Sequence, residues 1–217
     1  MSGRLKVAVL ISGRGSNMQA LVRACAAPDY PAEIVLVLSN KADAAGLEFA
    51  RKAGLATAVV SHRDFADRAS FDAAMDAKIR SHGAELICLA GFMRLLDPAF
   101  VDAWRDRMLN VHPALLPAFR GLDTHERALA AGVKIAGCTV HFVRSDMDTG
   151  PIVAQAAVPV LSGDSADSLA ARILEQEHII YPMALRLVAE GRVTVEGDRA
   201  IVDAGGGADA LRNPDAG

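Results

Sequence analysis

Two polar side chains in the stretch "RMLNVHPALLPAFRG", residues 107–121, have the chemistry needed to stabilise a developing negative charge. In an extended strand alternate residues share a face, so Asn110 and His112 are expected to point the same way and Val111 the other. An amide and a protonated imidazole both donate hydrogen bonds to a carbonyl oxygen that gains charge. Pro113 cannot donate within a central ladder, so strand pairing should end there. The alternative is a polar strand end in which a backbone carbonyl satisfies His112.

A histidine with an ordinary pKa of about 6.5 needs a neighbouring carboxylate to be mostly protonated at neutral pH. The stretch "RSDMDTGPI", residues 144–152, offers Asp146 and Asp148. Clusters of aspartate and glycine are also typical of ordinary turns. The spacing does not decide which aspartate, if either, reaches His112.

A glycine turn, "SGRGSN", follows the first apolar run of the chain. Its glycines allow backbone N–H groups to approach an anion, and the helix that follows adds a positive end of about half a charge. Met18 stands where a dinucleotide-binding loop has its third glycine, which weakens the case for an NAD-dependent oxidoreductase. A single phosphate monoester suits the turn better. The alternative is a tight turn in which Ser16 or Asn17 caps the helix.

Apolar runs alternate with helical patterns over the first half of the chain, which predicts an α/β fold with an open, mostly parallel, twisted sheet and helices on both faces. Beyond Ile135, two extended runs and a long helix predict an antiparallel excursion. The expected strands are 5–11, 33–39, 56–60, 85–92, 107–112, 135–143 and 151–160, and the expected helices are 16–27, 42–54, 65–82 and 165–190.

Composition restricts the class of protein. Hydrophobic residues make up 52% and charged residues 23%, which indicates a soluble globular chain. A net charge of −3 argues against a nucleic-acid or anionic-membrane surface. Three scattered cysteines and no signal-peptide pattern favour a cytoplasmic protein. We expect a single domain over 1–203 and a disordered, glycine-rich tail over 204–217.

Taken together, these stretches resemble the folate-dependent phosphoribosylglycinamide formyltransferases, which have a Rossmann-like fold. The resemblance implies an enzyme that transfers a formyl group from 10-formyltetrahydrofolate to the amine of glycinamide ribonucleotide, in de novo purine biosynthesis and without a metal. It also implies small-molecule substrates only and a monomer or homodimer. The matching stretches are "VLISGRGSNMQAL", "SNKADAAGLEFARKAGL", "LAGFMRLL", "LNVHPALLPAFRGLDTH", "GCTVHFV", "DMDTGPIVAQAAVPV" and "QEHIIYP".

The resemblance assigns roles to residues of this chain and selects the second aspartate as catalytic. In the N-terminal half it implies the phosphate side of the site, and the C-terminal half completes a folate cleft. The implied catalytic residues are Asn110, His112 and Asp148. The implied contacts to glycinamide ribonucleotide are Gly15, Ser16, Asn17, Met18, Gln19, Glu175, Gln176 and Glu177. The implied contacts to the folate are Arg68, Met93, Arg94, Leu95, Leu96, Asn110, Arg144, Ser145, Asp146, Met147 and Asp148.

Two other functions compete with this assignment. A formyltetrahydrofolate hydrolase shares the catalytic segment, but such relatives carry a regulatory domain ahead of it, and the first strand here starts at about residue 5. A non-catalytic phosphosugar-binding protein would explain the glycine turn but leave the catalytic residues without a role. His125 and His141 match no compact zinc motif, so we expect supporting or structural roles for them. Contacts near 118–125 are the least defined, because Asp123 departs from some relatives.

Overall fold

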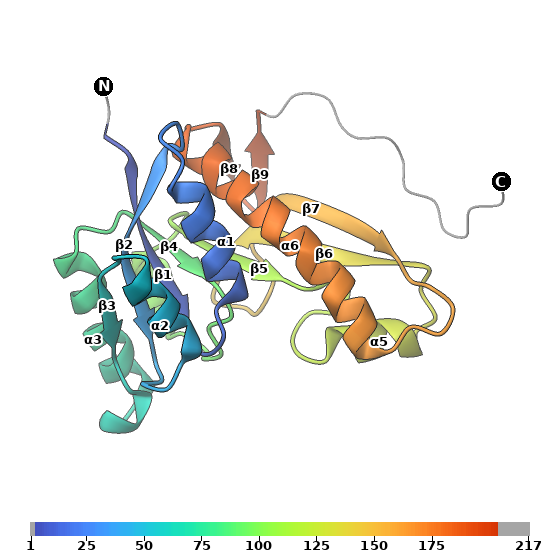
Figure 1. Ribbon diagram of the computed structural model, residues 1–217, viewed down its shortest axis with the longest axis horizontal. Helices are drawn as coiled ribbons and strands as arrows, with labels where there is room; N and C mark the ends of the chain where they lie inside the picture. The colour runs from blue at the N-terminus through green and yellow to red at the C-terminus, as the bar shows by residue number, and fades with distance from the viewer. Residues whose placement is uncertain (1–2, 204–217) are drawn as a thin grey trace. The chain divides into compact units, whose positions relative to one another are not determined.

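The computed structural model of the protein describes residues 3–203, in which strands and helices alternate (Figure 1). Seven strands form one sheet in the order β3-β2-β1-β4-β5-β6-β7, so the predicted α/β class is confirmed. The strands are β1 (Leu5–Ile11), β2 (Ala32–Ser39), β3 (Thr57–Val59), β4 (Leu86–Leu89), β5 (Met108–His112), β6 (Ile135–Phe142) and β7 (Ile152–Pro159). The α-helices are α1 (Ser16–Cys25), α2 (Ala45–Lys52), α3 (Arg68–Ser81), α4 (Pro98–Ala103), α5 (Thr124–Ala130) and α6 (Ala166–Ala189).

The chain divides into two compact units. Among the described residues, the first consists of 3–110 with Phe142–Ser145, and the second of Val111–His141 with 146–203. The predicted single domain over 1–203 stays a prediction, and the predicted tail, 204–217, lies outside the described residues.

Parallel pairing organises the first unit. β1 pairs with β2 and β4, β2 with β3, and β4 with β5, all in parallel. Strands buried in this way are apolar on both faces, and Val7 to Ile11 of β1 are all fully buried. The uninterrupted apolar runs of the sequence therefore reflect a sheet that is covered on two sides.

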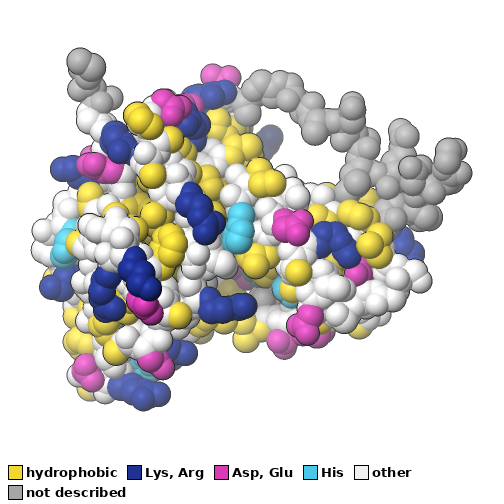
Figure 2. All heavy atoms as spheres, viewed as in Figure 1, with side chains coloured by type: hydrophobic (Ala, Val, Ile, Leu, Met, Phe, Trp, Pro, Cys, Tyr) yellow, Lys and Arg dark blue, Asp and Glu magenta, His cyan; other side chains and the backbone are white. Residues whose placement is uncertain are grey.

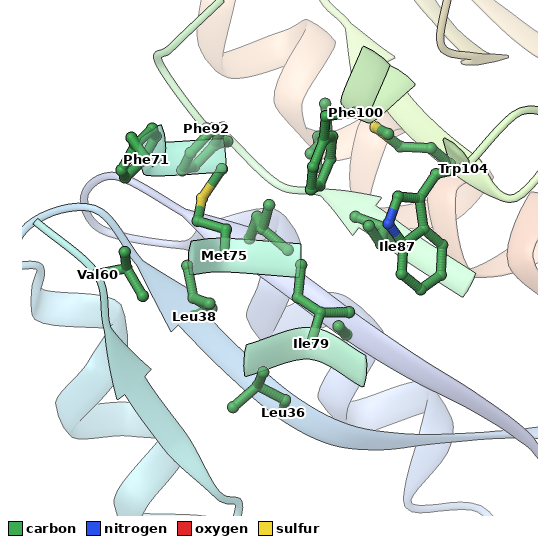
Figure 3. Packing of buried hydrophobic residues seen from close by; sticks show 14 residues of the cluster. Leu36, Leu38, Val60, Phe71, Met75, Ile79, Ile87, Phe92, Phe100 and Trp104 are labelled. Atoms are coloured by element: carbon green, nitrogen blue, oxygen red, sulfur yellow. The ribbon is translucent and has the colours of Figure 1, made fainter. Parts of the chain in front are cut away.

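One face of these strands packs against α3 and α4. Phe71, Met75 and Ile79 recur every four residues along α3, so they lie on one side of the helix. Figure 3 shows them over Leu36 and Leu38 of β2. The cluster also takes in Ile87 of β4, Met108 of β5, and Phe100 and Trp104 at α4. This packing fixes β4 and the start of β5.

On the opposite face of these strands, α2 packs closely at Gly46. A β-carbon on Gly46 would lie 2.6 Å from Ile11 Cδ1 and 3.2 Å from the carbonyl oxygens of Gly13 and Arg14. The Gly46 N–H donates to the Gly13 carbonyl at 3.0 Å. Gly46 therefore lets α2 sit directly against the glycine turn that follows β1.

The second unit is built on an antiparallel pair and a long helix, as the sequence predicts. β6 pairs antiparallel with β7, and α6 packs on β7 and α5. Ser165 caps α6 with a reciprocal pair of hydrogen bonds to Ser168. A hairpin of β8 (Val193–Glu196) and β9 (Arg199–Val202) completes the described part of this unit.

Most differences from the predicted elements lie at their ends. α3 begins at Arg68 rather than residue 65, because the Asp67 carboxylate accepts the Ser70 N–H at 2.8 Å and caps the helix there. α2 begins at Ala45 rather than residue 42, and β4 ends at Leu89 rather than residue 92. The short elements were not predicted; they are η1 (His62–Asp64), α4, α5, β8 and β9. Each of the helices among the described residues is too short or too polar to span a bilayer.

Gly46→Ala is expected to destabilise the protein by about 1–3 kcal/mol, because the added methyl group overlaps Ile11 and the glycine turn. Urea unfolding measures the change. Gly13→Ala is the matched control in the same turn, since a β-carbon there meets nothing within 4 Å. Equal stabilities of the two variants would contradict this account of the packing.

Candidate active site

His112 and Asp148 form a buried pair in the second unit. His112 is the last residue of β5 and is 5% exposed. Asp148 lies in the loop between β6 and β7, and its Oδ2 is 3.4 Å from His112 Nδ1. The Gly121 N–H donates to the same oxygen at 2.8 Å. Asp146 is exposed. Of the two aspartates that the sequence offered, the structure brings Asp148 to the imidazole.

Both ring nitrogens of His112 face acceptors. Nε2 lies 2.9 Å from the Phe119 carbonyl oxygen, which can only accept, so the proton on Nε2 is assigned from this partner. Nδ1 faces the Asp148 carboxylate. A doubly protonated ring satisfies both partners at once. The backbone-carbonyl contact named as the structural alternative is therefore present beside the ion pair.

A second imidazole lies on the other side of Asp148. His141 Nε2 is 3.7 Å from Asp148 Oδ1, and the His141 side chain is 2% exposed. Asp148 has a left-handed backbone with φ of 54°, a conformation that aspartate adopts more readily than most residues. This backbone turn directs one carboxylate towards two histidines.

Two polar side chains, the buried Thr139 and the more exposed Gln155, fasten the segment that follows β5. Thr139 Oγ1 donates to the Ala114 carbonyl at 2.7 Å and accepts the Leu116 N–H at 3.1 Å. Gln155 Nε2 donates to the Leu116 carbonyl at 2.9 Å. The backbone beyond Pro113 therefore finds its partners on β6 and β7, and β5 ends where the proline predicted.

Asn110 lies on β5 in register with Leu89 of β4, and it is half-buried. It belongs to the first unit, and His112 belongs to the second. Their placement two residues apart on one strand gives their side chains the same facing, by strand alternation.

The glycine turn presents the first turn of α1. Gly15 occupies the N-cap with φ of 69°, so the capping role considered for Ser16 or Asn17 is wrong. A glycine cap has no side chain to bind the first backbone N–H groups, which leaves them suited to an anion. Met18 is fully buried, and its Cε would lie 3.0 Å from a β-carbon at Gly15. Only the backbone of Met18 is available at this turn, while Gln19 is half-buried.

The three α6 residues predicted to contact glycinamide ribonucleotide differ in exposure. Glu175 is exposed, Gln176 is half-buried, and Glu177 is 6% exposed. Burial first, and then the negative charge of Glu177, raise the pKa of the Cys138 thiol to about 12. Glu177 therefore acts on the face of β6 that carries Cys138, within the second unit.

Large apolar side chains stand exposed at two of the predicted folate segments. In the first unit, Met93 is 63% exposed and Leu95 is 55% exposed, while Leu96 packs partly on the core cluster. In the second unit, Met147 is 48% exposed. Such side chains are suited to cover a flat ring.

Arg144 and Ser145, also predicted to contact the folate, differ from each other. Arg144 is half-buried, its Nη2 pairs with Asp106 Oδ1 at 2.5 Å, and its Nη1 donates to the Val143 carbonyl. Ser145 is exposed. The Arg144 guanidinium is therefore already held by protein groups.

The charges of Arg68 and Arg94 both act on one buried carboxylate in the first unit, that of Asp72. Asp72 is 1% exposed; its Oδ2 accepts the Asp97 N–H at 2.5 Å, and among the described residues its Oδ1 has no hydrogen-bond partner. Burial raises the pKa of Asp72, while the Asp97 N–H and the charges of Arg68 and Arg94 act in the opposite direction. Asp72 thus anchors the end of the segment that holds Met93 to Leu96.

A family model described as formyl transferase matches residues 5–185. The chain belongs to the formyl transferase family. It is 44% identical over 199 residues to phosphoribosylglycinamide formyltransferase of Escherichia coli K12, covering 92% of this chain and 94% of that protein. The solved structure of glycinamide ribonucleotide transformylase 1 from Symbiobacterium toebii matches with a TM-score of 0.91 and 47% identity, over 93% of this chain and 95% of that one.

A longer relative matches over part of its own length. The chain is 50% identical over 190 residues to the trifunctional purine biosynthetic protein adenosine-3 of Bos taurus, which covers 88% of this chain. This formyl transferase spans 19% of the length of that relative.

Several groups around the His112–Asp148 pair of this formyl transferase were not predicted from the sequence. They are the Phe119 carbonyl, the Gly121 N–H and, as a partner of Asp148, His141. The one signal for His141 is a histidine within the otherwise apolar run "AGCTVHFV". Within residues 3–203, no group of three or more histidine, cysteine, aspartate or glutamate side chains is placed to hold a metal ion.

Asp72→Asn is expected to raise the melting temperature at pH 7. Because the folded pKa of Asp72 is raised, its contribution to stability is present below the unfolded pKa and is lost as pH rises through the folded pKa. The gain of the variant should therefore shrink as pH falls towards 4, where the parent carboxyl is protonated. Thermal unfolding at both pH values measures it.

Asp102→Asn, at an exposed position, is the control and should change the melting temperature little at either pH. A pH-independent gain in Asp72→Asn would mean that the buried charge is not its cause.

Proposed function

We propose that the protein transfers the formyl group of 10-formyltetrahydrofolate to the amine of glycinamide ribonucleotide, giving formylglycinamide ribonucleotide and tetrahydrofolate in de novo purine biosynthesis. The observation that carries the proposal is the buried His112–Asp148 pair at the end of β5 in a chain that corresponds along nearly its whole length to a phosphoribosylglycinamide formyltransferase. The proposed activity is the one in the name of that relative. The further activities of the longer trifunctional relatives are not proposed for this chain.

The reaction needs an oxyanion site and a path for one proton. The folate co-substrate supplies a formyl group on nitrogen, and the neutral amine of the acceptor attacks its carbon. The Asn110 amide and the His112 imidazolium donate to the oxygen that gains charge. His112 Nε2 exchanges the Phe119 carbonyl for this oxygen, while Asp148 stabilises the positive ring through Nδ1. Asp148 also assists movement of the amine proton to the leaving folate nitrogen, through water.

The acceptor binds by its phosphate at the glycine turn. The glycine-capped first turn of α1, the Ser16 hydroxyl and the positive end of the helix favour a phosphate monoester. The Asn17 and Gln19 amides add donors. Glu177, with Glu175 and Gln176 beside it on α6, accepts from ribose hydroxyls.

The folate binds against exposed apolar side chains. Met93, Leu95 and Leu96 supply a wall for the flat pterin and benzoyl rings, and the backbone of 144–148, with Met147, contacts the polar edge. Arg68 and Arg94 face a negative glutamate tail, since a guanidinium fork matches a carboxylate. Arg144 supports this segment through Asp106.

The partners and compartment follow from the same function. We expect a single catalytic domain over 1–203, with the phosphate side in its N-terminal half, acting in the cytoplasm as a monomer or homodimer. Small-molecule substrates are the only ligands proposed, with no nucleic acid, membrane or metal. On the described part of the face in Figure 2, acidic and basic side chains are mixed, which supports this expectation.

A two-substrate assay tests the function. Tetrahydrofolate formation is followed by absorbance with and without glycinamide ribonucleotide, and formate is measured in parallel. Product that depends on the acceptor supports the transferase. Formate release at the same rate without the acceptor would identify a hydrolase. Binding of both ligands by calorimetry without turnover would identify a non-catalytic binding protein.

His112→Ala is expected to lower kcat about 10²–10³-fold, because one donor to the oxyanion is lost. Asp148→Asn should also lower kcat, since the ring then loses the charge that stabilises its protonated form. Stopped-flow absorbance with both substrates saturating measures each variant. His82→Ala removes a half-buried imidazole at the C-cap of α3 and should leave kcat unchanged. Near-normal turnover of His112→Ala would remove this histidine from the mechanism.

A further inference from the structure

A cavity of about 150 Å³ lies within the second unit, behind the segment that follows β5. Ala136 and Gly137 of β6, Ala128 of α5 and Ile173 of α6 contribute to its wall, together with Leu115 and Phe119 from the segment itself. Ala128, Ala136 and Ile173 are buried, whereas Ala118 is exposed and Phe119 is half-buried, so the cavity has a buried inner wall and opens to solvent on one side.

The cavity suits an uncharged occupant. Among the described residues that line it, polar side chains come from Thr124 and His125. Burial lowers the pKa of His125 most, the charge of His112 lowers it further, and Glu126 opposes both. The charged form of His125 is thus disfavoured, which suits an uncharged ligand better than an ionic one. A buried water needs two to four polar partners, so a wall of this kind favours an apolar molecule over water.

We propose that this cavity is a binding site for one uncharged aromatic ring of about the size of benzene. Apolar cavities of roughly 150 Å³ stay dry and take up benzene or xenon, because the ligand restores van der Waals contacts that the empty wall lacks. The ring would pack between Ala128, Ile173 and Phe119.

Phe119 links this site to His112. It lines the cavity, its ring lies 5.7 Å from the Arg127 guanidinium, and its carbonyl oxygen is the acceptor of His112 Nε2. Its φ of 52° is unfavourable for a residue with a side chain, so its position depends on the packing around it. An occupant that packs on Phe119 holds the carbonyl in place, and His112 then releases Nε2 less readily. This consequence for turnover rests on the proposed function.

Benzene titration of the full chain tests the site. The melting temperature should rise saturably with benzene, and crystals under xenon pressure should show density between Ala128 and Phe119. Turnover at saturating benzene should fall at least twofold. Benzoate, a ring of similar size with a charge, should do neither, because the site desolvates its ligand.

A filled cavity supplies the matched variant. Ala128→Leu should abolish the response to benzene, whereas Ala130→Leu, exposed on the same helix, should keep it. If Ala128→Leu does not fold, Ala128→Val and the xenon density in the parent protein decide the matter.

The outcomes separate the two proposals. No saturable benzene response and no xenon density would overturn the site. Benzene binding with unchanged turnover would overturn the link through Phe119 and leave the transfer reaction standing. Absence of formyl transfer before any benzene is added would overturn the proposed function, while the melting and xenon measurements would still test the cavity.

Discussion

The candidate site in the second unit depends on where the Asp148 carboxylate is held. Asp148 accepts the Gly121 N–H, and its two oxygens face the imidazoles of His112 and His141. A buried carboxylate is costly unless partners of this kind surround it. The left-handed backbone at Asp148 shapes the loop between β6 and β7, and the hydrogen bonds of Thr139 hold the segment after β5. Together they keep the Asp148 carboxylate next to the His112 ring.

In the first unit, close contacts between neighbouring elements hold the segments of the candidate site. Gly46 lets α2 contact the glycine turn, and Gly15, with its positive φ, lets the chain turn into α1. On the other side of the strands, α3 anchors the segment of Met93 to Leu96 through the buried carboxylate of Asp72. Each of these two segments, proposed to bind a ligand, is thus attached to a core helix by a contact that a slightly larger or uncharged residue would alter.

Local pattern predicted the elements whose interactions are repetitive. β1, β2, β5 and β6 were predicted nearly to their ends, because a largely buried strand leaves an apolar run. β7 was also predicted nearly to its ends, although it is only partly buried. α6 was predicted because it is long and capped by Ser165. The helices α4 and α5 and the strands β8 and β9 were not predicted from the sequence. Each spans only four to seven residues, which is too few for a helical or strand period to be recognised. α3 starts three residues later than predicted, because the Asp67 carboxylate caps the helix there although the apolar spacing begins at Phe65.

The sequence by itself determined the α/β class, the glycine turn, the polar pair on β5 and, by resemblance, the family. Those features are written in neighbouring residues, where strand and helix periods relate sequence to facing. Spacing left Asp146 and Asp148 open, and the resemblance selected Asp148. Only the tertiary structure decided that Asp148 lies against His112, that the Phe119 carbonyl faces the other ring nitrogen, and that His141 lies across the carboxylate. These contacts join residues up to 36 positions apart (His112 to Asp148), and distances across such loops depend on backbone turns that spacing in the sequence does not encode.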